Sequence, residues 1–580
     1  MNVNLLFMDG KYQPPGDIPW NRVDLEKDLD LEIIFSAMAG KDSYVFDVCR
    51  KTILKSLNDY ETIIYRQNVL KDAIDNQILV REMYSTIVNA VIEAKKQFFW
   101  INHSNPEFAL HESISVLKIY LAALEKIRET GRAALPSLHS EGFRQLFSMI
   151  IREFNQEYIG IVSGHLESLS FPKGIYVRGG LGMGNSLTGY TLVVPDIRPD
   201  RIMEKIAHIR EPRYTYVLPD RDESGGKALA DMRTRSIRET AEIVSESAKN
   251  VLAFIDKLKE EIAFYLGCLN LWNELRSTGA QISFPVPEND AKSETSYEGI
   301  YDVALSLRVH KTPVGNSLRA ESDSIILITG ANKGGKSTLL RAIGQAQLMM
   351  QCGMFVAAES FSTYIASSIC THFKREEDSG MAIGKFDEEM NRMSAIVDHI
   401  AVGSRLFFNE SFSSTNVMEG SEVAMQVINA LLAKGMKIIF VTHFNELAEA
   451  YIGSAQRPTF LRVERLEDET RTFKVLRADP IPTSFGYDKF LRIFGETDEF
   501  KGINQRIMEM ESHPEIICLT SLVFYPIMPR TFPNIPFPDK ISEFIAEILL
   551  SFTCLLQDSF WIRLCKFAIV AKIPQRNCCS

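Results

Sequence analysis

A lysine set among glycines and hydroxyl side chains directly follows a run of apolar residues. Residues 325–338 read IILITGANKGGKST, so four residues separate Gly330 from the sequence Gly335-Lys336-Ser337. Glycines allow the backbone of such a loop to turn its N–H groups toward one anion, and the positive end of a following helix adds to the attraction. The spacing Gly-x-x-x-x-Gly-Lys-Ser therefore predicts a loop that binds the phosphates of a nucleotide.

The loop residues divide the work of holding this nucleotide. Lys336 can reach the β- and γ-phosphates, and the Ser337 hydroxyl can ligate Mg²⁺. The sequence therefore predicts ATP and Mg²⁺ as cofactors. The predicted nucleotide-binding residues are Gly330, Asn332, Gly334, Gly335, Lys336, Ser337 and Thr338.

The flanking residues favour a phosphate-binding loop over an ordinary glycine-rich turn. Residues 325–328 have the composition of a buried strand, and apolar residues recur at helical spacing after the loop. These apolar helix positions are Leu339, Leu340, Ile343 and Leu348. A strand, a loop and a helix in this order form the context that the motif requires.

A second candidate segment, LFFNESFSSTN at residues 406–416, places Asn409 and Glu410 after an apolar strand. In ATPases with such loops, an acid at the strand end helps to hold Mg²⁺, and a following glutamate polarises the attacking water. Glu410 suits the second task, whereas Asn409 stands where aspartate is usual. An amide oxygen accepts a hydrogen bond from Mg²⁺-bound water but brings no charge, so Asn409 predicts looser metal binding or slower hydrolysis.

His443 is the third candidate, because it ends the apolar run KIIFVTH. A histidine at the end of a strand beside the nucleotide can sense the γ-phosphate or donate to it. The alternative is a histidine with a purely structural role. Together with Lys336 and Glu410, His443 completes the predicted catalytic set.

Composition and net charge limit the class of protein to which this sequence can belong. Of 580 residues, 46% are hydrophobic and 24% are charged, which is typical of a globular protein, and length alone predicts about four domains. The net charge of −10 means that nucleic acid must be bound by a local basic face. We find no secretory signal and no apolar stretch long enough to span a membrane, so we expect a cytoplasmic protein without a membrane partner.

Two long helices are predicted from apolar spacing. Residues 105–107 read Asn-Pro-Glu and form a helix start, and the apolar steps that follow continue to Gly131, which we expect to end the helix. A second apolar seam over residues 237–265 predicts a packed helix of about thirty residues. Residues 30–100 are also rich in helix formers and show no convincing strand.

Strands are expected elsewhere. Residues 174–195 predict a small hairpin, and residues 301–309 predict a strand that joins the following domain. Residues 214–238 predict a strand, a polar turn and the entry to the second helix. Residues 323–490 alternate strands and helices in the manner of a parallel α/β sheet.

The chain after Pro514 changes in character and becomes rich in proline and cysteine. Two interpretations stay open: a small partner-binding module, or translated sequence outside the ancestral reading frame. The nine cysteines of the chain form no C-x-x-C pair, which argues against a zinc site or a disulfide framework.

The ordered set of motifs resembles the ATPase domain of MutS-type mismatch-repair proteins. The resemblance is carried by the segments ITGANKGGKST, DSGMAIGKFDEEM (378–390), LFFNESFSSTN, FVTHFNEL (440–447) and TSFGYD (483–488). It is strong over residues 295–495 and fainter upstream, where the helices resemble the core and lever helices of MutS and residues 174–220 resemble its DNA clamp. The resemblance implies an ABC-type ATPase that binds DNA and works as a homodimer.

The resemblance also implies that each nucleotide lies between one subunit's phosphate loop and a signature segment of its partner. In this sequence the segment comprises Gly384, Lys385, Phe386 and Glu389. MutS proteins usually carry serine at the position of Gly384 and methionine at that of Lys333. These two departures concern the catalytic rate more than nucleotide binding.

One part of a mismatch-recognising MutS protein is absent from the sequence. Such proteins insert the phenylalanine of an N-terminal Phe-x-Glu motif beside the mismatched base. The first 300 residues contain no Phe-x-Glu. We therefore expect a MutS-like ATPase without the mismatch-recognition domain.

These observations predict an α/β ABC-type ATPase domain, a mainly α-helical core and lever region, and a small β-containing clamp. The expected boundaries are an arm (1–29), a helical core (30–104), lever helices (105–271) with a clamp-like insertion near 170–220, a connector (272–322), the ATPase domain (323–500) and the tail (501–580). We expect an enzyme that couples ATP hydrolysis and dimer closure to DNA clamping, in mismatch repair or a related DNA transaction. The alternatives are a nucleotide-gated clamp with little hydrolysis, and a protein that binds branched DNA or RNA.

Overall fold

A computed structural model describes most of the first compact unit of the chain. The chain divides into two units, Met1–Ser484 and Phe485–Ser580. The described residues are 3–8, 19–97, 105–172, 174–185, 187–193, 215–290, 293–320, 324–330, 333–375, 384–452, 458–465 and 471–481. Asn332, residues 378–383 of the motif DSGMAIGKFDEEM, the TSFGYD segment and the tail lie outside them.

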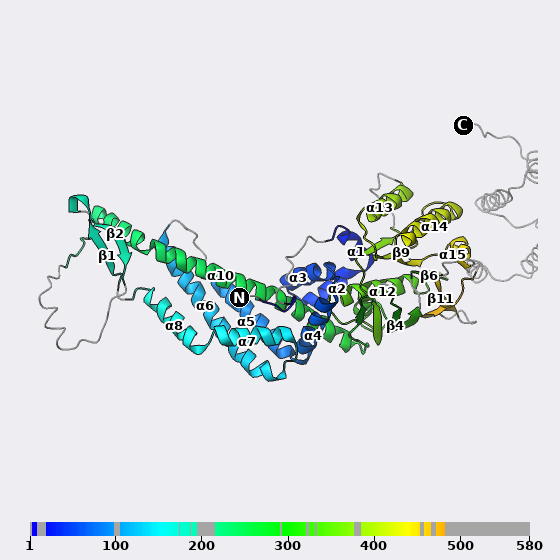
Figure 1. The fold of residues 1–580 in the computed structure, drawn as a ribbon, viewed down its shortest axis with the longest axis horizontal. Coiled ribbons are helices and arrows are strands. Elements are labelled where there is room, and N and C mark those ends of the chain that lie inside the picture. The colour runs from blue at the N-terminus through cyan, green and yellow to red at the C-terminus, as the bar shows by residue number, and fades with distance from the viewer. Residues whose placement is uncertain are drawn as a thin grey trace, which may run out of the picture. The chain divides into compact units, whose positions relative to one another are not determined.

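The N-terminal half is helical and carries one hairpin (Figure 1). Its elements are α1 (Arg22–Asp28), α2 (Leu31–Ala39), α3 (Ser43–Leu54), α4 (Tyr60–Asp75), α5 (Gln77–Gln97), α6 (Pro106–Ala134), η1 (Leu135–Ser137), α7 (Glu141–Glu153), α8 (Gln156–Ser168), β1 (Val177–Leu181), η2 (Met183–Asn185), β2 (Leu187–Leu192) and α10 (Glu223–Ser277). Residues 30–97 form helices only, as predicted.

The C-terminal half of the described unit alternates strands and helices. Its elements are β3 (Val286–Glu288), β4 (Thr295–Ile300), α11 (Val303–Val309), β5 (Asn316–Ala320), β6 (Ile325–Thr329), α12 (Lys336–Gln351), β7 (Ser360–Tyr364), β8 (Ile369–Phe373), α13 (Lys385–His399), β9 (Arg405–Asn409), α14 (Val417–Ala433), β10 (Lys437–Val441), α15 (Asn445–Ile452), β11 (Thr459–Arg465) and β12 (Arg471–Arg477).

Helix α6 begins where the sequence predicted but ends later. The Asn105 side chain accepts a hydrogen bond from the Glu107 N–H at 2.9 Å, and Pro106 occupies the first turn. The prediction that Gly131 ends the helix was wrong, because α6 continues to Ala134. Gly131 instead allows close packing: a Cβ there would lie 2.0 Å from the Phe147 ring.

Helix α10 contains the predicted apolar seam and is much longer than expected. It spans 55 residues, and its N-terminus is capped by Asp222, whose carboxylate accepts from the Gly225 N–H. The seam residues Ile237, Ile255, Leu258, Ile262 and Tyr265 are fully buried. The seam packs against other helices, which include α6, and burial continues beyond it at Leu271 and Leu275.

Of the three segments expected to contain strands outside the ATPase region, one forms them. Within the segment 174–195, strands β1 and β2 pair in the predicted antiparallel hairpin. Residues 215–219 have no regular structure, and Tyr216 and Val217 are exposed. Residues 303–309 form helix α11 instead of a strand, because the Asp302 carboxylate caps the N–H of Leu305 at 3.1 Å.

Residues 3–8, expected to belong to an arm, pack into the helical region. Leu5 and Leu6 are buried there, and their N–H groups donate to the buried Glu261 carboxylate at 2.6 and 3.2 Å. Tyr265 of α10 donates from its hydroxyl to the Leu5 carbonyl at 2.6 Å. Burial raises the pKa of Glu261 to about 6, and Lys257 opposes this shift.

The predicted parallel sheet has six strands in the order β12-β11-β6-β10-β9-β8. Every neighbouring pair from β11 to β8 is parallel, and β12 adds an antiparallel edge. A second, mixed sheet has the order β3-β7-β4-β5. Among the described residues, no helix combines the length and the apolar character needed to cross a bilayer.

Arg405 connects the two sheets. It is the first residue of β9, its exposure is 0%, and its guanidinium donates to Gln347 at 2.9 Å, to Thr363 at 2.8 Å and to Thr295 at 3.0 Å. Thr363 and Thr295 belong to β7 and β4 of the second sheet. The guanidinium also lies 5.0 Å from the centre of the Tyr364 ring.

We expect Arg405→Ala to lower the free energy of unfolding by about 3 kcal/mol or more, because it opens a cavity and deprives three buried polar groups of a partner. Urea denaturation measures this loss. Arg319→Ala is the matched control: this β5 side chain is 80% exposed, so the change should stay below about 0.5 kcal/mol. An unchanged urea midpoint for Arg405→Ala would mean that the sheets do not depend on this side chain.

Candidate functional site

Three strands bring the predicted site residues to one edge of the six-stranded sheet. The phosphate loop follows β6, His443 follows β10, and Asn409 and Glu410 lie at the end of β9. Because β6, β10 and β9 are parallel neighbours, their carboxyl ends share an edge, which is where open α/β sheets bind ligands. The Glu410 N–H donates to the Val441 carbonyl at 2.9 Å and extends the pairing past the strand end.

The phosphate loop closes on itself through Lys336. Its Nζ donates to the Gly330 carbonyl at 2.7 Å, and the residue is 4% exposed. Burial lowers the pKa of Lys336, and Glu410 opposes this shift. Gly330 has a φ of 117°, and a Cβ there would lie 3.1 Å from Val463, so the loop requires glycine at this position.

Helix α12 points its N-terminus at the loop. Gly335, with a φ of 96°, precedes the helix, and Lys336, Ser337 and Thr338 form its first turn. The helix spans 16 residues, and the N–H groups of its first turn and its dipole favour an anion at this end. The predicted apolar residues Leu339, Leu340, Ile343 and Leu348 are buried and fix the helix on the sheet.

The two predicted metal-site residues lie in contact. The Ser337 hydroxyl donates to the Asn409 amide oxygen at 2.8 Å, which joins the start of α12 to the end of β9. Both atoms are oxygens, the donor type that Mg²⁺ prefers. The donor set therefore fits a hard divalent cation, with one hydroxyl and one neutral amide where the usual pattern has a carboxylate.

Glu410 and His443 face each other at the same edge. Glu410 Oε1 lies 3.8 Å from His443 Nδ1, an ion-pair separation rather than a direct hydrogen bond. The interaction with His443 is the main reason why the pKa of Glu410 lies below its ordinary value, and Lys336 and Lys374 act in the same direction. Glu410 is therefore ionised at neutral pH, as a group that polarises water must be.

The signature segment divides between the surface and the interior. Gly384 is exposed and precedes α13, whereas Lys385 and Phe386 are half-buried. Glu389 is 2% exposed and accepts hydrogen bonds from Phe412 and Ser414 of the same chain. Both carboxylate oxygens of Glu389 are used within its own chain, and its role in a trans signature stays a prediction.

His372 of β8 contacts Ser411, the first residue of the loop that follows Glu410, and sequence analysis did not identify this pair. The His372 ring is buried, and its Nδ1 lies 2.8 Å from the Ser411 hydroxyl. A polar residue within the apolar strand ICTHF was the only signal in the sequence.

Comparison with known proteins gives two family matches. Residues 58–278 match the MutS2 N-terminal domain, and residues 326–489 match MutS domain V. The second match contains the predicted site residues from the phosphate loop to His443. The first covers α4 to α10 and the hairpin.

Similar proteins come from bacteria and a mammal. The DNA mismatch repair protein MutS of Lactobacillus delbrueckii subsp. bulgaricus is 27% identical over 257 residues, which cover 42% of this chain and 30% of that protein. Endonuclease MutS2 of Ligilactobacillus salivarius is 24% identical over 350 residues, 58% of this chain and 43% of that protein. MutS protein homolog 4 of Mus musculus is 29% identical over 177 residues, which cover 30% of this chain and 18% of that protein. The chain spans less than half the length of each of these relatives.

We expect His443→Ala to raise the pKa of Glu410, because burial, which raises it, is then less opposed. Titration of ¹³C-labelled glutamate carboxyls by NMR measures the shift. His399→Ala is the control: this ring stacks on Trp20, away from Glu410, and its loss should leave the titration unchanged. An unaltered Glu410 titration in His443→Ala would contradict the assignment of His443 as the main cause.

Proposed function

The chain belongs to the MutS family, and from this premise we propose that it is a DNA-associated ATPase that binds ATP with Mg²⁺ and works as a homodimer. The observation that carries the proposal is the meeting of Lys336, Ser337, Asn409, Glu410 and His443 at one sheet edge. MutS domain V is an ATPase domain, and the match to it includes this edge.

Each side chain has one task in the proposed reaction. Lys336 neutralises charge on the β- and γ-phosphates, while the N–H groups at the start of α12 hold their oxygens. Ser337 would hold Mg²⁺ and Asn409 would accept from a metal-bound water, and a bound ion would supply positive charge beside the phosphates. Glu410 orients the attacking water, and His443 holds Glu410 ionised and donates to the γ-phosphate.

The proposed dimer uses the exposed end of α13. Gly384 has no side chain, so its trans contribution to the partner's nucleotide is made by its backbone and by Lys385. Helix α10 links the helical region near α2 and α3 to the β1–β2 hairpin, which its contacts reach. We assign the hairpin to DNA holding and α10 to transmitting closure of the ATPase domains.

Lys336→Ala should lower kcat/KM for ATP at least about 100-fold and weaken ATP binding, because the buried ammonium and its phosphate contacts are lost. Steady-state phosphate release and equilibrium ATP binding measure the two effects. Lys434→Ala, an exposed lysine after α14, should leave both unchanged. Wild-type affinity and turnover in Lys336→Ala would refute the assignment of the loop.

The same phosphate-release assay identifies the nucleic acid. Mismatched duplex, perfect duplex, branched DNA and RNA are added separately at one fixed salt concentration, since salt strongly alters such affinities. Stimulation by duplex DNA supports the proposal. Stimulation only by branched DNA or RNA would reassign the target.

Asn409 favours a second candidate function, a nucleotide-gated clamp with little hydrolysis. Its neutral amide takes the place of the usual carboxylate beside Ser337. Wild-type turnover of about 1 s⁻¹ or faster would exclude this candidate.

If wild-type turnover is slow, Asn409→Asp should raise Mg²⁺ affinity and turnover about tenfold, because a carboxylate adds charge at the metal site. Mg²⁺ titrations of phosphate release measure the change. Asn429→Asp, on α14, adds the same charge away from the site and is the control. Equal Mg²⁺ dependence of Asn409→Asp and wild type would count against this account of Asn409.

A further inference from the structure

The loop that carries Glu410 has a backbone that needs external support. Glu410 has a φ of 54° and Phe412 a φ of 63°, a region that residues with side chains rarely adopt. Such conformations persist only where surrounding contacts hold them. The direction of the Glu410 carboxylate therefore depends on whatever fixes residues 410–414.

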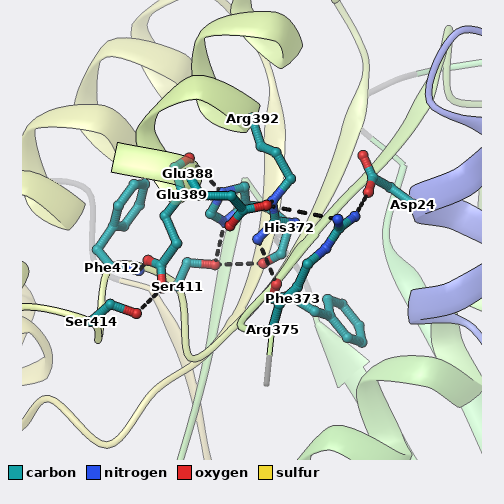
Figure 2. Close-up of polar contacts among 10 residues, drawn as sticks. All are labelled: Asp24, His372, Phe373, Arg375, Glu388, Glu389, Arg392, Ser411, Phe412 and Ser414. Atoms are coloured by element: carbon teal, nitrogen blue, oxygen red, sulfur yellow. Dashed lines mark hydrogen bonds and ion pairs between the residues drawn. The ribbon is translucent and has the colours of Figure 1, made fainter. Parts of the chain in front are cut away.

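Glu389 supplies the contacts that fix this loop. One carboxylate oxygen accepts from the Phe412 N–H at 2.5 Å, and the other accepts from the Ser414 hydroxyl at 2.5 Å (Figure 2). Ser413, between them, donates from its hydroxyl to the Glu410 carbonyl at 2.6 Å. Both oxygens of a buried carboxylate are thus used to hold the loop in place.

His372 joins the same helix to the residue after Glu410. Its Nε2 lies 3.0 Å from the Glu389 backbone carbonyl, and its Nδ1 lies 2.8 Å from the Ser411 hydroxyl (Figure 2). Burial lowers the pKa of His372 to about 3, so the ring is neutral and carries one N–H. Because a carbonyl can only accept, Nε2 holds the proton and donates to the Glu389 carbonyl. The single Ser411 hydroxyl proton is shared between Nδ1 and the His372 carbonyl, which lies 2.5 Å from the hydroxyl oxygen.

Helix α13 is itself anchored to the sheet. Arg392 Nε lies 2.7 Å from the Glu388 carboxylate, and Arg392 Nη2 donates to the Phe373 carbonyl at 2.8 Å. Arg375 contacts Glu388 at 3.7 Å and pairs with Asp24 of α1 (Figure 2). Glu389 therefore stands on a helix with fixed position and can transfer that position to the loop.

We propose that Glu389 is a positioning residue for the ATPase reaction, which acts within its own chain by holding the Phe412–Ser414 backbone so that Glu410 faces the water beside the phosphate loop. His372 supports it by fixing Ser411 and α13. This inference rests on the proposed ATPase function. It places the buried face of the N-terminal part of α13 beside the water-orienting group of the same chain, while the exposed Gly384–Lys385 start serves the partner.

The test compares Glu389→Ala with Glu389→Gln. The alanine variant loses both loop contacts, so kcat should fall roughly 10- to 100-fold while the Kd for ATP changes less than about threefold. The glutamine amide can still accept from the Phe412 N–H and donate to Ser414, so it should restore most of kcat. Asp398→Asn, on an exposed position of α13, is the matched control and should equal the wild type.

A third variant guards against misfolding of Glu389→Ala. Ser414→Ala removes one of the two contacts from the loop side and should lower kcat by a smaller factor, again without altering ATP affinity. Unchanged kcat in Glu389→Ala, or in Ser414→Ala if Glu389→Ala does not fold, would overturn the proposal. Loss of ATP binding in Glu389→Gln would overturn it as well, since a positioning role does not require the Glu389 charge to act on the nucleotide.

Mixed dimers separate action in cis from action in trans. Two affinity tags isolate dimers of one wild-type chain with either a Lys336→Ala chain or a Lys336→Ala/Glu389→Ala chain. Equal turnover of the two mixed dimers supports action in cis, whereas lower turnover with the double variant would show that Glu389 acts on the partner's nucleotide. If the protein is monomeric with ATP bound, a kcat loss in Glu389→Ala is necessarily in cis.

Measurements on the wild-type protein distinguish failure of the proposed ATPase function from failure of the proposed role of Glu389. If it neither binds ATP nor releases phosphate, the proposed ATPase function fails. If it does both and Glu389→Ala matches it, only the positioning role fails.

Discussion

Parallel pairing of β6, β10 and β9 is the constraint on which the candidate site depends. Each strand delivers one element of the chemistry: the phosphate loop, His443, and the pair Asn409–Glu410. The pairing fixes the relative positions of these groups along the sheet edge. The Ser337–Asn409 contact and the Lys336–Gly330 contact then close the site from above the strand ends.

Features encoded in consecutive residues could be predicted from the sequence. The Asn105 cap, the seam of α10 and the strand–loop–helix around Lys336 depend on local patterns, and the structure contains all three. Predictions failed where a local pattern has two solutions. Residues 303–309 have the apolar composition of a strand, but the Asp302 cap and burial of one helical face favour α11. Gly131 looked like a helix end and instead admits the Phe147 ring.

The direction of the Glu389 side chain could not be predicted from the sequence. The signature motif identified Glu389 but not the loop that binds it, because Phe412 and Ser414 lie on a separate segment that only the fold brings near. His372 gave even less signal, since its role depends on the pairing of β8 with β9 and on the helix above. Such contacts join segments that are distant in the sequence, and no sequence pattern indicates that these segments will meet.

Both helices of the nucleotide site are tied to the same short segment of the helical region. Arg375, next to β8 and paired with Glu388 of α13, contacts Asp24 of α1, and Gln345 of α12 donates to the Leu29 carbonyl at 3.0 Å. Arg341 of α12 adds an ion pair with Asp30 at 3.1 Å.

Helix α2 follows directly and packs against α10, so the segment from α1 to α2 lies between the nucleotide site and the long helix. The contacts of Arg375, Gln345 and Arg341 join α12 and α13 directly to the segment from α1 to α2. A shift of α12 or α13 would therefore strain these polar contacts before it strained any contact of α10. Polar contacts of this kind have narrow geometric tolerance, whereas apolar packing tolerates small sliding. The segment from α1 to α2 therefore joins both helices of the nucleotide site to α10 by direct contacts.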